Sequence, residues 1–290
     1  MPSRKRLRPA AGFAAAVVVA ATAAGCSSGG SAAQRPKNWA SPKATATPLT
    51  ASQLLAAAAK NSSGVKSFTG QLSIKITGKT KATMNGSIAE RNKPFSADIN
   101  MSSPSAGSHD SGADSVLITP KEAYIKVPAA VLPGSVNTPW LGLNLSSVKE
   151  HGTSLSTVLG QADNNPFSDA QMLTATENAR ITGTGTVNGV SATEVSGTVP
   201  ISQALSKLPS KERTELGQAA EQQGIGQIKF TEWIDARHQL QKAVEDESGS
   251  TVSETTTMTM LSINQPVSVS APPKSQVTQI PASALKDISQ

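Results

Sequence analysis

The sequence predicts an α+β fold: a curved antiparallel half-barrel sheet of about ten strands, with helices covering the concave face. Two observations predict this class. Apolar and polar residues alternate with the period of two that is typical of strands, in two blocks at about 67–127 and 179–270. Helical patterns are confined to 51–61, to short pieces between 145 and 173, and to the region after 200. A sheet with one apolar face has to cover it, and these few helices are the candidates.

The first helix is predicted over 51–61. Thr50 and Gln53 have the spacing of a capping box, in which each residue bonds the backbone N–H of the other. A run of leucine and alanine follows, and Asn61 and Gly64 end it.

Five strands separated by short polar turns follow this helix and predict an antiparallel meander. A loop rich in serine and glycine, 102–112, separates the third strand from the fourth, which holds Val116–Ile118. The alternation places one set of large apolar residues on the inward face of the first three strands. These candidate cavity residues are Phe68, Leu72, Ile74, Ile76, Met84, Ile88, Phe95, Ile99 and Met101.

The second block begins with a strand at 179–183. Asn188-Gly189 predicts a tight hairpin turn into a strand at 191–199, because both residues tolerate positive φ. Short helical pieces are expected around 145–150, 154–160 and 167–173, a longer helix at 210–223, and further strands at 226–235, 239–247, 252–263 and 266–270. The later candidate cavity residues are Ile228, Phe230, Leu240, Val244, Met258 and Met260.

The N-terminus has the features of a lipoprotein signal peptide over residues 1–25. Four basic residues precede an apolar stretch of 15 residues, Ala10 to Ala24, which is shorter than the roughly 20 residues that a membrane-spanning helix needs. Ala23-Ala24-Gly25-Cys26 then matches a lipobox, so we expect cleavage before Cys26 and lipid attachment to its thiol. Residues 26–48 are small and polar and predict a disordered tether on the extracytoplasmic face of the cell membrane.

Charge and residue types exclude several classes of function. After loss of residues 1–25 the chain has 22 Lys and Arg against 20 Asp and Glu, scattered along the sequence, so a nucleic-acid partner is not expected. Ser108-His109-Asp110 brings hydrolase residue types together, but adjacency in a loop gives no triad geometry. His109, His151 and His238 lack metal-ligand spacing. No catalytic residue, metal or cofactor is therefore predicted.

Several stretches, in this order along the chain, resemble the actinobacterial LppX/LprG-type lipoproteins, which are similar in fold to the LolA/LolB carriers. The order of elements agrees over roughly 49–273, and 274–290 reads as a flexible tail. The matching stretches are Leu54-Leu55 with Val65-Lys66-Ser67-Phe68, the hairpin from Val187 to Val199, Glu232-Trp233-Ile234-Asp235 with His238-Gln239-Leu240, and Met258-Thr259-Met260-Leu261-Ser262-Ile263 before Pro266-Val267 and Pro272-Pro273.

The resemblance implies a lipid-binding domain at 49–273, with an apolar cavity that holds the acyl chains of a lipid or glycolipid. Such a protein carries its ligand within the cell envelope without catalysis, and a membrane transporter is a candidate partner. Without the resemblance, the same alternation also fits an ordinary packed core. The alternative function is a non-enzymatic envelope sensor or scaffold of the same fold.

Overall fold

The computed structural model describes residues 48–78, 81–102, 114–126, 138–146, 168–208, 210–250 and 252–281. The predicted signal peptide, Cys26 and the tether therefore lie outside the described residues. The same holds for most of the 102–112 loop, which includes Ser108-His109-Asp110, and for the predicted helical piece at 154–160.

The opening helix α1 (Ala51–Ser62) begins with the predicted capping box. The Gln53 N–H donates to Thr50 Oγ1 at 3.3 Å, and the Thr50 N–H donates to Gln53 Oε1 at 2.9 Å. Leu54, Leu55 and Ala58 form the buried stripe of the helix. The spacing of these residues, three to four apart, is the reason one side of α1 can pack against a sheet.

The predicted meander is confirmed in the first half of the sheet. It consists of β1 (Ser67–Gly78), β2 (Ala82–Asn92), β3 (Phe95–Ser102), β4 (Asp114–Ile118) and β5 (Glu122–Lys126). Each strand pairs antiparallel with the next. On the other side β1 pairs with β11 (Val252–Ile263), which joins the two ends of the domain in one sheet.

The second half follows the predicted order closely. It contains α4 (Ser168–Leu173), β7 (Arg180–Val187), β8 (Val190–Pro200), α5 (Ile201–Leu205), α6 (Ser210–Gln223), β9 (Gln227–Asp235) and β10 (Leu240–Ser248). The hairpin turn has φ values of +48° at Asn188 and +80° at Gly189, as its residue types predict.

Within the described residues, twelve strands form one open curved sheet, in the order β12-β6-β5-β4-β3-β2-β1-β11-β10-β9-β8-β7. The two strands that were not predicted are β6 (Trp140–Asn144) and β12 (Val277–Gln279), and they pair parallel to each other. The expected purely antiparallel sheet of about ten strands is therefore wrong in these respects. Part of the predicted C-terminal tail is instead an edge strand, preceded by a short 3-10 turn (Lys274–Gln276).

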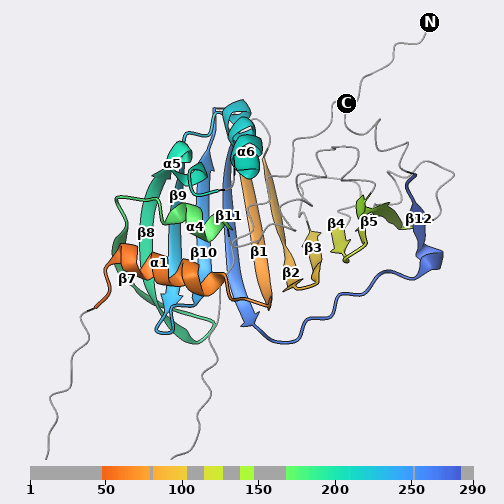
Figure 1. The fold of residues 1–290 in the computed structure, drawn as a ribbon, viewed down its shortest axis with the longest axis horizontal. Coiled ribbons are helices and arrows are strands. Elements are labelled where there is room, and N and C mark those ends of the chain that lie inside the picture. Colours follow the sequence, from red (N-terminus) through yellow and green to blue (C-terminus); the bar gives the residue numbers. More distant parts are fainter. Residues whose placement is uncertain are drawn as a thin grey trace, which may run out of the picture.

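The strand predicted at 266–270 is also wrong. The chain leaves the sheet at Asn264, whose φ of +55° turns the backbone away after its N–H has bonded Ser67 O at 2.7 Å. Pro266 follows, and proline has no N–H to donate to a sheet. In the view of Figure 1, the segment instead runs past the lower ends of the strands to reach β12.

The helices α1, α4, α5 and α6 lie over the half of the sheet that runs from β7 to β1 (Figure 1). The main core cluster joins buried residues of α1, α4 and α5 to those of β1, β2 and β8–β11. A second cluster, which contains Ala97, Ile118, Ala123 and Leu143, lies on β3–β6 and includes no residue of these helices. No helix among the described residues is long and apolar enough to span a bilayer.

Candidate functional site

The face of the sheet that packs against the helices, here called the helix face, continues from β11 onto β2–β6. The strand register aligns one row of residues across seven strands of this face. The row is Met260, Gly70, Ile88, Ile99, Val116, Ile125 and Leu141. Residues opposite each other in adjacent strands point to the same side, so the row is continuous.

Burial changes along this row. Met260 and Ile88 are 3% and 2% exposed, because they lie in the main core cluster beside the helices. Ile99, Val116, Ile125 and Leu141 are only half-buried, on four adjacent strands. Met84 and Met101 are also half-buried on the same face. These six residues together, Met84, Ile99, Met101, Val116, Ile125 and Leu141, are called the apolar strip below.

Most of the predicted cavity residues lie on the helix face. Nine are buried in the main core cluster: Phe68, Leu72, Ile74, Ile88, Ile228, Phe230, Leu240, Met258 and Met260. Four more, Ile76, Met84, Ile99 and Met101, are partly buried and pack against that cluster, while Phe95 packs against the second cluster. The structure therefore divides the predicted set into packed core and a partly accessible edge.

Val244 does not lie with the others. The register between β9 and β10 shifts between Leu240 and Lys242, which is a β-bulge at Gln241. One extra residue moves every later side chain to the opposite face. Ala243 and Glu245 are therefore buried beside the core, and Val244 is half-buried on the other side, so its prediction is wrong.

Two glycines make room for methionine side chains on this face. A Cβ on Gly86 would lie 2.6 Å from Met101 Sδ and 2.0 Å from Asn100 O. A Cβ on Gly70 would lie 3.1 Å from Met258 Sδ. Methionine is unbranched and fills irregular gaps, so Met101 and Met258 occupy the space beside these two glycines.

Carboxylic acids on the helix face were missed from the sequence. Glu232 and Glu90 are each 3% exposed, and burial raises the pKa of each from 4.5 to about 8. Burial also raises the pKa of Glu247, with a smaller contribution from Glu254 directly opposite on β11. Ile228, Phe230 and Glu232 are spaced two residues apart on one strand. This spacing could have predicted that Glu232 lies on the same face as the two apolar side chains.

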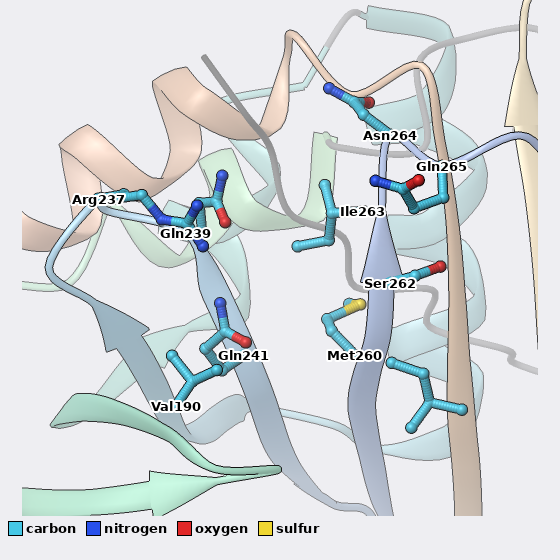
Figure 2. Close-up of a pocket in the computed structure, with 10 residues that line it drawn as sticks. Val190, Arg237, Gln239, Gln241, Met260, Ser262, Ile263, Asn264 and Gln265 are labelled. Atoms are coloured by element: carbon cyan, nitrogen blue, oxygen red, sulfur yellow. The ribbon is translucent and has the colours of Figure 1, made fainter. Parts of the chain in front are cut away.

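A pocket of about 420 Å³ lies where the β7–β8 hairpin meets the start of β10 and the end of β11 (Figure 2). Asn188 Nδ2 donates to Met260 O at 2.9 Å and holds the hairpin tip there. Six of the lining side chains are polar, and Met260 is the one predicted cavity residue among them. The lining residues are Val190, Arg237, Gln239, Gln241, Met260, Leu261, Ser262, Ile263, Asn264 and Gln265. Such a lining suits a polar group, whereas the apolar strip suits hydrocarbon.

No family model and no curated protein matches the sequence. Among solved structures, the chain is similar to the Mycobacterium tuberculosis lipoprotein LppX, with 15% identity and a TM-score of 0.46, over 76% of this chain and 98% of that one. It is similar to LprF from Mycobacterium bovis, with 16% identity and a TM-score of 0.45, over 77% and 96% of the two chains. A LolA superfamily protein from Nitrosomonas europaea matches with 10% identity and a TM-score of 0.26, over 79% and 97%. These solved structures are of LppX, LprF and a LolA superfamily protein, and the sequence stretches resemble LppX/LprG-type lipoproteins, which are similar in fold to the LolA/LolB carriers.

Proposed function

We propose that this protein binds an acylated lipid or glycolipid on the helix face and carries it within the cell envelope. The observation that supports this most directly is the apolar strip. Its aliphatic side chains on β3–β6 are half-buried, at the border of the main core cluster and along the second cluster, which includes no residue of the helices. Such a surface can bind the acyl chain of a lipid but provides no groups for a chemical reaction on it.

The dimensions of the strip fit one acyl chain. Ile99 and Leu141 are three strand spacings apart, which is about 14 Å at about 4.8 Å per spacing. One leaflet of a bilayer has a hydrocarbon depth of about 15 Å. Each methylene that leaves the bilayer for water costs about 0.8 kcal/mol, so a carrier has to offer a comparable apolar surface.

The sequence supports an anchored location for this activity. We propose that residues 1–25 are removed, that Cys26 carries the lipid anchor, and that residues 26–48 tether the domain at 49–273 to the outer face of the cell membrane. The lone cysteine makes this testable by intact mass. The exported protein should carry a lipid adduct, and Cys26→Ala should carry none.

The ligand proposal is tested by mass spectrometry of lipid that co-purifies with the full chain. We expect lipid with acyl chains in the wild type and a loss of about tenfold or more in Val116→Glu, because a buried charge beside hydrocarbon is strongly unfavourable. Ser87→Glu is the matched control, since Ser87 is exposed on the opposite face of β2.

Equal lipid content in the two variants would contradict binding at the apolar strip. A wild-type protein that is free of lipid would contradict the proposed function as a whole. That result would favour the envelope sensor or scaffold.

A further inference from the structure

Turns from distant parts of the chain lie together at one end of the sheet. The Asn92 N–H donates to Lys66 O at 2.9 Å, which joins the end of β2 to the start of β1. Asn61 Nδ2 donates to Arg237 O at 2.9 Å, which joins the end of α1 to the β9–β10 turn. The pairing of Ala97 with Ile118 places the β4–β5 turn at the same end.

Basic side chains dominate this end, which is called the basic end below. Five of them are exposed and one is half-buried, and they come from five separate turns or element ends. They are Lys60, Lys66, Lys93, Lys121 and Arg237, with Arg91 half-buried.

The acidic groups described at this end balance only part of these charges. Asp235 is 4% exposed and is bonded by Arg237. Glu122 accepts a hydrogen bond from the Tyr124 hydroxyl. Glu90 is buried on the helix face. Four lysines and Arg91 remain against the half-buried Glu122, so the exposed surface of this end, within the described residues, is positive.

The opposite end has a different balance. Its exposed basic side chains are accompanied by Glu221, Asp246, Glu247 and Glu254 on neighbouring strands and on α6. These basic residues are Lys75, Lys81, Lys126, Arg180, Lys207, Arg213 and Lys229. The two ends thus differ in the carboxylates that accompany their basic side chains, in a chain that is nearly neutral once the four basic residues before Cys26 are set aside.

We propose that the basic end is a docking surface for an anionic phospholipid bilayer. Clustered lysine and arginine side chains near such a surface each contribute about a fivefold gain in binding. This inference builds on the proposed function, because docking in this orientation brings the apolar strip near the lipid headgroups. Ile99 is four residues along β3 from Phe95 at the basic end, which is about 13 Å at 3.3 Å per residue.

The test is co-sedimentation of the full chain with vesicles, in the Cys26→Ser background so that no acyl anchor holds it. Vesicles of phosphatidylcholine alone are compared with phosphatidylcholine mixed with phosphatidylglycerol. We expect binding that rises with phosphatidylglycerol and falls at high salt, since screening shortens the reach of these charges. The N-terminal apolar stretch is present in every variant and gives the same background.

Two variants with equal charge change locate the surface. Replacing Lys60, Lys66, Lys93 and Lys121 by glutamine should lower the binding that depends on phosphatidylglycerol by about tenfold or more. Replacing Lys75, Lys81, Lys207 and Lys229 by glutamine should leave it within about twofold. Unchanged melting temperatures of both variants show that the fold is intact.

Three outcomes would overturn the proposal: equal losses in both variants, no loss in the first variant, or preferential binding of a nucleic acid over the vesicles. Failure of the proposed function looks different. In that case the basic end would still select anionic vesicles, while no lipid would co-purify with the wild-type protein.

Discussion

The ring of Phe230 on β9 lies directly against Gly197 on β8. The two residues are register partners, and a Cβ on Gly197 would lie 2.7 Å from Phe230 Cζ and 3.2 Å from Thr176 Oγ1. Phe230 is 3% exposed and is part of the main core cluster, so it has little room to move. The absence of a side chain at position 197 is therefore a packing requirement of this core.

Gly197→Ala should lower the free energy of unfolding by about 2 kcal/mol, because overpacking a filled core forces side chains off their preferred rotamers. The measurement is a urea unfolding midpoint with an unchanged slope. Gly183→Ala on β7 is the control, since a Cβ there meets nothing within 4 Å. Equal effects of the two variants would show that Phe230 does not impose the requirement.

Asp235→Ala should destabilise the β9–β10 turn by about 2–4 kcal/mol. One carboxylate oxygen accepts the N–H groups of Arg237 and Gln239 at 2.8 Å each, and the other accepts Gln241 Nε2 at 3.2 Å. Arg237→Ala is the control, because its side chain is 72% exposed and an exposed ion pair contributes at most about 1 kcal/mol. A larger loss in Arg237→Ala than in Asp235→Ala, measured by thermal unfolding, would refute this assignment.

Glu232 should make stability fall as pH rises. Its pKa is raised from 4.5 to about 8 by burial, so the folded protein holds this proton over a range in which the unfolded chain releases it. The stabilisation is complete below about pH 4.5 and is lost as pH rises toward 8, at about 1.4 kcal/mol per pH unit for one such group.

Glu232→Gln should therefore flatten the decline in melting temperature between pH 5 and pH 9. Glu194→Gln, at a half-buried position on the neighbouring strand β8, makes the same chemical change and should keep the wild-type slope. A Glu232→Gln profile parallel to the wild type would show that another group controls the pH dependence.

Gly142→Val should displace β12 from the edge of the sheet. A Cβ on Gly142 would lie 2.7 Å from Gln279 Nε2 and 2.8 Å from Val277 Cγ1. The Ile280 N–H donates to Gly142 O at 2.9 Å, and its hydrogen exchange reports this pairing. We expect faster exchange at Ile280 in Gly142→Val and no change in Gly185→Val, where the nearest atom, in Trp233, is 3.6 Å from the Cβ position.

The elements with strong local signals could be predicted from the sequence. The capping box at Thr50 started α1, Asn188-Gly189 turned the hairpin, and period-two alternation placed Phe68, Leu72 and Ile74 on one face. These signals are local because each depends on residues within a few positions of one another.

Features that depend on partners distant in the sequence could not be predicted. β6 and β12 are short; β12 pairs with β6, and β6 pairs also with β5. Position 142 has to be a small residue because side chains of β12 occupy the space beside it. The bulge at Gln241 reversed the side of Val244, since an extra residue in one strand is defined only against its neighbour.

The sequence by itself determined the class of fold, the order of most elements and, apart from Val244, the apolar residues that face inward. The tertiary structure alone decided which of those residues become solid core and which stay half-buried. That division depends on where α1, α4 and α5 cover the sheet: Ile88 is buried under the core cluster, while Ile99, its partner on the next strand, is partly open. Alternation records the face on which a side chain lies, and only packing decides what covers it.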